Sequence, residues 1–372
     1  MNKEASVLER YSEGAQEQQP ELCCPVDYDR SLLALLPQEI IEKDYGCGDP
    51  SRYVKEGDVV LDLGSGSGKI CYMAAQLTGE AGRVIGVDMN DDMLDLARKY
   101  KPEMAKKLGS DRVEFLKGQI QDLALDLTAT EAYLANHPVT DFRSLSEFKA
   151  WQEKQRREKP LIPSDSIDLV VSNCVLNLVD DQEKQQMIEE IFRVTKPGGR
   201  IAISDIVSDE PSPESMKTDP ELWSGCISGA MTEQAFLQAF IDAGFAAVKL
   251  DKWGNEPWRT VEGIEFRAVT VTACKPENSK CLDYGHAVVY RGPFREVHDD
   301  EGHVFPRGER IAVCERSYRL LMGGFYADQF IGIAPRKQSS PRAWCHPSGT
   351  RRSPAETKGG RHEGSTSDAS CC

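Results

Sequence analysis

The stretch from Val59 to Asp88 constrains the fold of this chain more than any other part of its 372 residues. It begins with a short apolar run that predicts a strand buried on both faces, and three closely spaced glycines follow directly. Helix-compatible residues continue to Leu77, and the apolar run from Val84 to Val87 predicts a second strand that ends at Asp88. This order of strand, glycine loop, helix and strand predicts an α/β protein with a parallel sheet.

The glycine loop itself predicts a binding site for a cofactor that contains a nucleoside. Glycines lack a Cβ and let a ligand approach the backbone, and the N-terminus of the next helix offers N–H groups. Asp88 lies about 20 residues beyond the loop, where a carboxylate accepts hydrogen bonds from ribose hydroxyls. A dinucleotide loop counted from Gly64 requires a further glycine where this chain has Lys69. The register DLGSGSG, residues 62–68, therefore argues against a dinucleotide.

Composition and charge restrict the class of protein further. The hydrophobic content of 40% and the charged content of 28% are ordinary for a globular protein. The net charge of −15 argues against nucleic acid or an anionic membrane as the main partner. No apolar run approaches the ~20 residues of a membrane span, and the polar N-terminus lacks the apolar core of a secretory signal. We therefore expect a cytoplasmic protein, in which twelve cysteines should not form a framework of disulfides.

The predicted elements divide the chain into four parts. Residues 1–44 form an N-terminal extension whose first part we expect to be solvated, and residues 45–275 form the main α/β domain, with a proline-rich loop at 208–231. Residues 276–335 contain short strand-like runs and predict a small β-rich module. Residues 336–372 are rich in Ser, Gly, Pro and Arg and predict a disordered basic tail. Seven strands are predicted in the main domain, at 59–61, 84–87, 113–116, from 166, 200–207, 248–250 and 265–274.

Histidines and cysteines in the small module raise the question of a metal site. Their spacing matches no compact zinc pattern, in which cysteines come in closely spaced pairs. We therefore predict core cysteines and surface histidines in this module, and no structural metal. The residues concerned are Cys281, His286, His298, His303 and Cys314.

Other cysteines lie where the predicted fold binds ligands. Cys174 follows the fourth strand, and open α/β sheets bind ligands outside the carboxyl ends of their strands. Cys226 follows Gly225 in a loop that is long for a simple connection. Glycines flank Cys47 on both sides and predict a mobile, accessible loop, where an incidental cysteine is the simpler interpretation of this residue alone. Position by itself thus leaves the role of these thiols open.

Taken together, four cysteine motifs resemble those of the arsenite S-adenosylmethionine (SAM) methyltransferases. The likeness extends from about residue 45 to residue 274. Residues 257–314 resemble the longer microbial and algal members of that family rather than the animal ones. The motifs are YGCG at Cys47, LDLGSGSGKICY at Cys71, SNCVLNLV at Cys174 and LWSGCISGA at Cys226.

The resemblance implies the class I SAM methyltransferase fold. This is a Rossmann-like α/β fold with a seven-stranded, mostly parallel sheet, here with a substrate-binding insertion and the small C-terminal module. The glycine loop and the acid beyond it would bind SAM. The residues implied in cofactor binding are Asp62, Gly64, Ser65, Gly66, Gly68, Asp88, Met89, Gln119, Ile120 and Asn173.

The resemblance also implies roles for the four cysteines. Cys174 and Cys226 would hold trivalent arsenic throughout the cycle, and Cys47 would be a third ligand for arsenite. Cys47 would form a disulfide with Cys71 during turnover, and thioredoxin or glutathione would reduce it. The implied function is arsenic detoxification, from arsenite to mono- and dimethylated arsenicals. We expect the enzyme to be a monomer.

The chemistry of arsenic agrees with thiols as the reactive protein groups. Trivalent arsenic is soft and binds thiolates. Its lone pair carries no proton, so attack on the sulfonium methyl of SAM needs no general base, and catalysis rests on positioning. Two alternatives remain open. One is a C- or O-methyltransferase of the quinone-biosynthesis type, which shares the loop and the sheet, and the other is a non-catalytic thiol protein that sequesters metalloids.

Overall fold

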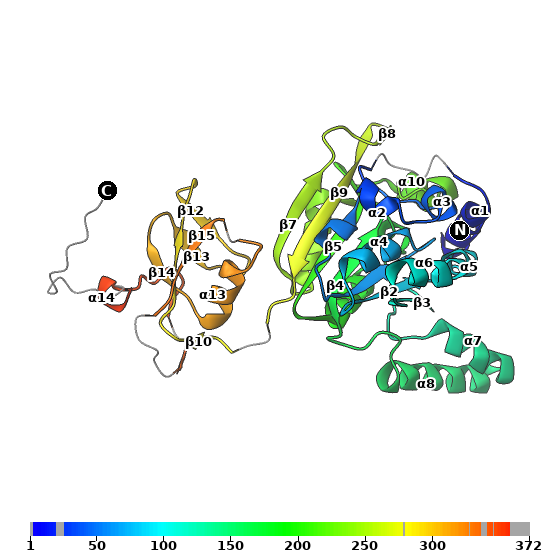
Figure 1. Cartoon of the computed structure of the whole chain (residues 1–372), viewed down its shortest axis with the longest axis horizontal. Coiled ribbons are helices and arrows are strands. Elements are labelled where there is room, and N and C mark those ends of the chain that lie inside the picture. Colours follow the sequence, from blue (N-terminus) through cyan, green and yellow to red (C-terminus); the bar gives the residue numbers. More distant parts are fainter. Residues whose placement is uncertain are drawn as a thin grey trace. The chain divides into compact units, whose positions relative to one another are not determined.

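The chain forms two compact units in the computed structural model (Figure 1). The first comprises residues 1–275 and the second begins at Pro276. The structure describes residues 3–19, 26–277, 280–326, 328–335, 341–344 and 346–357. Within these ranges, every helix is too short or too polar to cross a membrane.

A seven-stranded sheet forms the centre of the first unit. The sheet consists, in spatial order, of β3 (Val113–Lys117), β2 (Arg83–Asp88), β1 (Val59–Leu63), β4 (Ile167–Asn173), β5 (Thr195–Ser208), β9 (Ile264–Cys274) and β7 (Ala246–Trp253). The strands are parallel from β3 to β5, whereas β9 is antiparallel to both β5 and β7. The predicted seven-stranded, mostly parallel sheet is therefore confirmed. Two short strands, β6 (Met231–Thr232) and β8 (Arg259–Val261), pair with β5 and β9.

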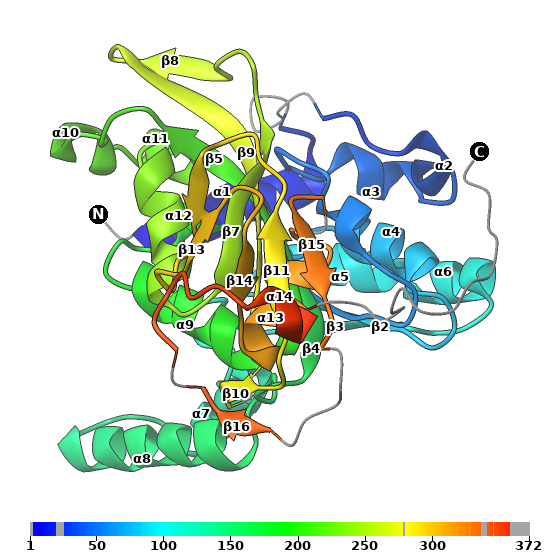
Figure 2. The same cartoon turned by 90° about the vertical axis from the view of Figure 1, so that its left-hand side faces the viewer.

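Helices cover both faces of this sheet because successive strand residues face opposite layers. Val60 of β1 packs in one layer with α4 (Lys69–Leu77), α5 (Asp91–Lys99) and α6 (Lys101–Leu108). Its neighbour Leu61 packs in the other layer with α9 (Lys184–Val194) and α12 (Glu233–Asp242). Figure 2 shows the two groups of helices on opposite sides of the sheet. Strands that are buried on both faces explain the continuous apolar runs of the sequence.

The N-terminal residues pack on the rest of the first unit, so our expectation of a solvated extension is wrong. They form helix α1 (Lys3–Gln16), in which Val7 and Ala15 are buried. Together with Tyr11 these residues follow a spacing of four, which places them on one helix face. Asn90, which caps the N-terminus of α5, donates a hydrogen bond to a carbonyl oxygen of α1 at 3.1 Å. Shorter helices follow at α2 (Arg30–Leu33), α3 (Gln38–Glu42) and a 3-10 turn (Pro50–Tyr53).

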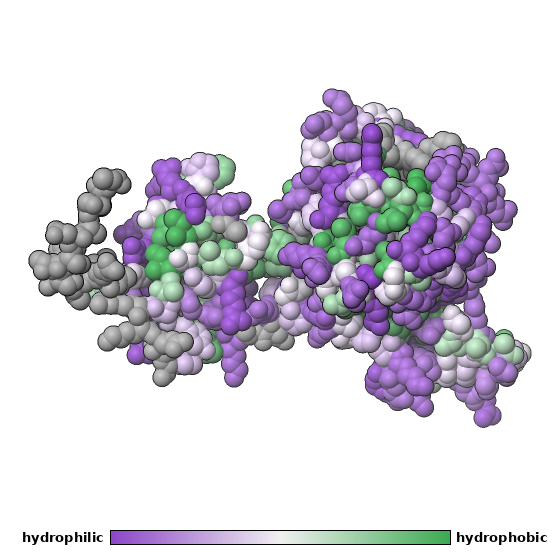
Figure 3. All heavy atoms as spheres, viewed as in Figure 1, coloured by the Kyte–Doolittle hydropathy of each residue, from purple (hydrophilic) through white to green (hydrophobic). Residues whose placement is uncertain are grey.

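The insertion after β3 forms two helices, α7 (Leu127–Asn136) and α8 (Phe142–Glu158). Helix α8 lies at the surface, because none of its residues is buried. Figure 3 shows mainly hydrophilic residues over much of α8. The rings of Tyr133 and Trp151 stack at 4.4 Å and join the two helices.

The proline-rich segment before β6 contains α10 (Glu214–Lys217) and α11 (Pro220–Ser224), and a 3-10 turn follows β4 (Leu176–Leu178).

The second unit is a small β-rich module, as predicted. Its core contains Val288, Tyr290 and Phe305. Arg352 is buried and forms an ion pair with Asp283. Residues 341–344 and 346–357 thus pack on this unit, which differs from the disordered tail that we expected; the rest of that tail lies outside the described residues. The elements are β10 (Leu282–Asp283), β11 (Ala287–Tyr290), β12 (Glu296–His298), β13 (Val304–Pro306), β14 (Arg310–Ala312), α13 (Glu315–Met322), β15 (Phe330–Ile333), β16 (Arg342–Ala343) and α14 (Pro354–Thr357).

The candidate metal ligands of this module each have protein neighbours. His286 lies 3.1 Å from Oε2 of Glu315, and His303 lies 2.7 Å from Oδ2 of Asp299. Cys314 is buried and caps α13 by accepting a hydrogen bond from a backbone N–H of the helix. Cys281 is exposed, so the expectation that both cysteines belong to the core is wrong for this one.

Candidate active site

The glycine loop joins β1 to α4 and lies against the end of β4. Gly64 has a φ of 65°, and a Cβ added to it would lie 2.4 Å from the side chain of Val175. Only glycine therefore fits at this position. Asp88 ends β2 and accepts hydrogen bonds from the backbone N–H groups of Gly66 at 2.8 Å and Asn90 at 2.9 Å. Burial raises the pKa of Asp88, and these two hydrogen bonds oppose that shift.

A cleft opens beside the glycine loop at the carboxyl edge of the sheet. Its walls contain most of the residues that we predicted to bind the cofactor: Asp62, Gly64, Ser65, Gly66, Asp88, Met89, Ile120 and Asn173. Of the other two, Gly68 is the N-cap residue of α4, and Gln119 donates a hydrogen bond to Glu4 of α1. The buried hydroxyl of Ser65 has no hydrogen-bond partner among the described residues. A polar atom without a partner in the wall of a cleft fits a polar ligand group.

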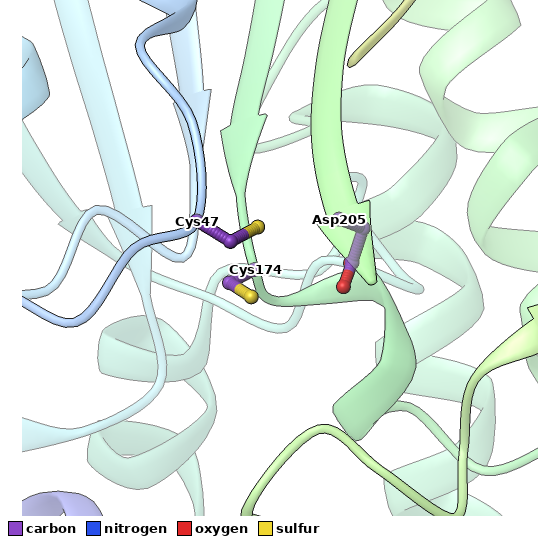
Figure 4. A group of neighbouring side chains, drawn as sticks. All are labelled: Cys47, Cys174 and Asp205. Atoms are coloured by element: carbon purple, nitrogen blue, oxygen red, sulfur yellow. The ribbon is translucent and has the colours of Figure 1, made fainter. Parts of the chain in front are cut away.

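Two of the predicted thiols lie together at this edge. Cys47 and Cys174, with Asp205 of β5, form a group in which the two Sγ atoms and a carboxylate oxygen are all within 4.8 Å of one another. Figure 4 shows the three side chains, which come from the loop before β1, the end of β4 and β5. Cys174 also lines the cleft. The group is therefore next to the cleft beside the glycine loop.

The loop that carries Cys47 is packed rather than accessible. Asn173 accepts hydrogen bonds from the N–H groups of Cys47 at 2.9 Å and Gly48 at 3.0 Å. A Cβ added to Gly46 would lie 2.1 Å from the amide of Asn173, and one added to Gly48 would lie 2.3 Å from the Ser204 hydroxyl. Cys47 is consequently only 6% exposed, and our prediction of a mobile, accessible loop is wrong. The flanking glycines allow close packing here.

Cys226 joins this group from the segment after α11. Its Sγ donates a hydrogen bond to the carbonyl oxygen of Cys174 at 3.2 Å. Both residues have left-handed backbone conformations, with φ of 65° at Cys174 and 61° at Cys226. Residues other than glycine occupy this region at an energetic cost, and such residues gather at functional sites.

Cys71 lies apart from these three thiols. It is fully buried in α4, and its Sγ donates a hydrogen bond to Oδ2 of Asp62 at 3.2 Å. Burial raises the pKa of Asp62 to about 8. Burial and the neighbouring Asp62 also raise the pKa of the Cys71 thiol. The seven cysteines within the described residues all carry thiols, so the pairing of Cys47 with Cys71 stays a prediction.

The sequence reasoning missed two residues of this site. Asp205 is buried on β5, and Tyr11 of α1 lines the cleft with its hydroxyl 4.0 Å from Sγ of Cys226. The position of Asp205 near the carboxyl end of a predicted strand was a usable signal. The contact of Tyr11 with Cys226, 215 residues along the chain, had no such signal.

Comparisons with known proteins agree with this geometry. Residues 54–244 match a methyltransferase domain family. An arsenite methyltransferase of Aquipseudomonas alcaligenes is 30% identical over 82% of this chain and 81% of its own length. The chain belongs to the arsenite methyltransferase family. Residues 277–362 match a domain of unknown function, DUF8838.

Other members of the family show how the likeness is distributed. The arsenite methyltransferase of Mus musculus is also 30% identical, over 89% of this chain and 80% of its own length. These identities do not separate the bacterial relative from the animal one. The crystal structure of an arsenic (III) S-adenosylmethionine methyltransferase from Chlamydomonas reinhardtii matches 87% of this chain and 100% of its own, with a TM-score of 0.55 and 26% identity. The predicted SAM methyltransferase fold is thereby confirmed. A demethylmenaquinone methyltransferase of Lactobacillus johnsonii, at 29% identity, matches only 40% of the chain.

Proposed function

We propose that this chain transfers the methyl group of SAM to trivalent arsenic held by thiolates, and so detoxifies arsenite. The observation that carries the proposal is the convergence of three buried thiols beside the cofactor cleft. Sγ of Cys47 and Sγ of Cys174 belong to one group, and the Cys226 thiol is hydrogen-bonded to the carbonyl of Cys174. Membership of the arsenite methyltransferase family supports the same substrate.

The three thiols are the proposed ligands of arsenite. Each thiol replaces one hydroxyl of arsenite, with one As–S bond formed and one water released per thiol. The side chains of Cys47, Cys174 and Cys226 are at most 6% exposed, so the bound arsenic is shielded from competing water. A soft centre with three thiolate ligands keeps a lone pair for the methyl group.

The cofactor site is proposed on the glycine-loop side of the same cleft. SAM, when bound, supplies a methyl group on a positively charged sulfur. Asp88 is placed at the end of β2 to accept hydrogen bonds from the ribose, and the Ser65 hydroxyl offers a further polar contact. The protein contributes by holding the arsenic in line with that methyl group at about 3–3.5 Å.

Methyl transfer oxidises arsenic by two electrons, which must be returned. The bond between sulfur and methyl breaks, and the As–C bond takes its electrons from the arsenic lone pair. Oxidation of the Cys47 and Cys71 thiols to a disulfide supplies two electrons, and thioredoxin or glutathione reduces that disulfide. Cys71 must give up its hydrogen bond to Asp62 to take part in this step. We expect a monomer that works in the cytoplasm.

The decisive test is mass spectrometry of arsenic species after incubation of the protein with SAM, arsenite and thioredoxin or glutathione. Mono- and dimethylated arsenicals are expected. Methyl transfer to a quinone or a phenol, with none to arsenic, would reject this function in favour of a quinone-type enzyme. Binding of arsenite without binding of SAM in calorimetry would instead identify a sequestering protein.

A further inference from the structure

The buried carboxylate of Asp205 faces the two thiols that are nearest to it, those of Cys47 and Cys174 (Figure 4). A carboxylate oxygen within 4.8 Å of two Sγ atoms suggests a third ligand of a bound ion. The hydrogen bonds of Asp205 argue otherwise. Its Oδ2 accepts from the backbone N–H groups of Leu176 at 2.8 Å and Asn177 at 3.3 Å.

The other oxygen of Asp205 is occupied as well. Its Oδ1 accepts from the side-chain amide of Asn177 at 2.8 Å and from the N–H of Ile206 at 2.7 Å. A carboxylate has about four acceptor positions, and here four N–H groups use them. Trivalent arsenic also prefers thiolate to carboxylate. Asp205 therefore acts on the protein chain rather than on the arsenic.

The segment that Asp205 holds is the turn directly after Cys174. This turn begins with the left-handed backbone of Cys174, at a φ of 65°. Such a conformation persists only where the surroundings hold it. Two of the four hydrogen bonds join this turn to strand β5. They are donated by the backbone N–H groups of Leu176 and Asn177, two and three residues after Cys174. The carboxylate thus fixes the direction in which the Cys174 side chain leaves β4.

Asn177 extends this restraint to the segment that carries Cys226. Both hydrogens of its amide are used, one toward Asp205 and the other toward the carbonyl of Ile206 at 2.7 Å. The backbone carbonyl oxygen of Asn177 lies against Gly229, where an added Cβ would be only 2.0 Å away. The Lys184 ammonium donates to the carbonyl of Gly229 at 2.5 Å. Burial raises the pKa of Asp205 to about 6, and the charge of Lys184 opposes that shift. Asp205 and Asn177 therefore connect the Cys174 turn to the Cys226 segment.

We propose that Asp205 and Asn177 are positioning residues that set the relative placement of the Cys174 and Cys226 thiols, and with it the affinity for methylated arsenic. This inference rests on the proposed function. A monomethyl arsenical has two exchangeable ligands, so it is held by this pair alone. Loss of the restraint weakens binding of arsenite and of the monomethyl species alike. Loss of Cys47 differs, because it removes a ligand that only arsenite uses.

The test compares Asp205→Asn, Asn177→Ala and the double variant with the wild-type chain. Asp205→Asn keeps the shape of the side chain but places an NH₂ group against N–H donors. Asn177→Ala removes the side-chain amide but keeps the hydrogen bonds from backbone N–H groups to Asp205. Ser208→Ala is the matched control, because Ser208 is also buried on β5 and its hydroxyl has no partner among the described residues. The measurements are KM and kcat for arsenite and for monomethylarsenite, and the affinity for SAM in calorimetry. Equilibrium dialysis of monomethylarsenite against a Cys174→Ser protein gives the background from other thiols.

Asp205→Asn should raise KM for both arsenicals by about tenfold or more, which corresponds to about 1.4 kcal/mol. The affinity for SAM should stay within about twofold of the wild type. Asn177→Ala should have a smaller effect, and the double variant should be no worse than Asp205→Asn because the two residues share one network. Ser208→Ala should match the wild type.

Three results would overturn the inference. In the first, both single variants keep the wild-type KM for both arsenicals. In the second, SAM and arsenical affinities fall together, which means that the two residues support the whole fold. In the third, X-ray absorption of the arsenite-loaded wild type shows an arsenic–oxygen bond that Asp205→Asn removes, which makes Asp205 a ligand. If the wild type itself binds no monomethylarsenite above the Cys174→Ser background, the proposed function fails first, and this inference with it.

Discussion

The thiol of Cys226 donates a hydrogen bond to the backbone carbonyl of Cys174 at 3.2 Å, across a separation of 52 residues. The two cysteines come from the segment after α11 and from the end of β4. Both have left-handed backbones, so each thiol has a direction that its own segment imposes. Two thiols in such fixed positions fit a soft substrate that is bound by two thiolates.

Replacement of either member of this pair should abolish all methylation. We expect Cys174→Ser and Cys226→Ser to lower kcat/KM for arsenite and for monomethylarsenite by more than about 100-fold, the scale for misplacing a reacting group. Arsenic speciation by mass spectrometry measures the loss. Cys274→Ser is the control, because Cys274 is a buried cysteine on β9 outside the proposed ligand set. Its thiol donates a hydrogen bond to the carbonyl of Ala246. Retained methylation of monomethylarsenite by Cys174→Ser would show that the ligand assignment is wrong.

The other two cysteines should divide the two methylation steps. Cys47→Ser removes the third ligand of arsenite and Cys71→Ser removes the predicted disulfide partner. Both variants should lose methylation of arsenite but keep the first methyl transfer to reduced monomethylarsenite within about threefold, because two thiolates hold that substrate and the Cys47–Cys71 disulfide forms only after the transfer. The measurement is the initial rate with each substrate. Equal loss on both substrates would mean that Cys47 or Cys71 supports the site in a different way.

Close packing at Gly46 predicts a selective effect of a single methyl group. In Gly46→Ala the new Cβ would meet the amide nitrogen of Asn173 at 2.1 Å, so the loop that carries Cys47 must shift. We expect KM for arsenite to rise by about tenfold, which corresponds to about 1.4 kcal/mol, with little change for monomethylarsenite. The control is Gly324→Ala, where an added Cβ meets nothing within 4 Å. An unchanged KM for arsenite in Gly46→Ala would refute the close fit at Asn173.

The buried carboxyl of Asp62 predicts how stability depends on pH. Burial raises its pKa from 3.8 to about 8 in the folded protein. Between these values the folded state binds a proton that the unfolded state has lost, so this group makes the free energy of unfolding fall as the pH rises from about 4 to about 8. Asp62→Asn cannot ionise and should flatten that slope and stabilise the protein at pH 8. Urea unfolding at several pH values, without SAM, measures the slope; an unchanged slope in Asp62→Asn would assign it to other groups.

Much of the fold was readable from local sequence. The apolar runs of the strands and the glycine loop specify structure through neighbouring residues, and both were found in the predicted places. The packing of α1 was missed because its apolar face consists of a few residues in a polar segment, and its partners are α5 and α11. The described part of the tail was misjudged for a similar reason. Its composition is typical of disorder, yet Arg352 forms an ion pair with Asp283 of the folded module.

The candidate site divides along the same line. The sequence by itself determined the class of cofactor, through the glycine register and Asp88, and it predicted which cysteines take part in the reaction, through their motifs. Only the tertiary structure decided which thiols meet. Cys47 and Cys174 meet near Asp205 because Asn173 accepts a hydrogen bond from the loop that carries Cys47. The Cys71 thiol instead donates a hydrogen bond to Asp62. The physical reason is that side-chain convergence depends on contacts between residues far apart in the chain, such as those of Asp205 with the turn after Cys174, and no local pattern encodes such contacts.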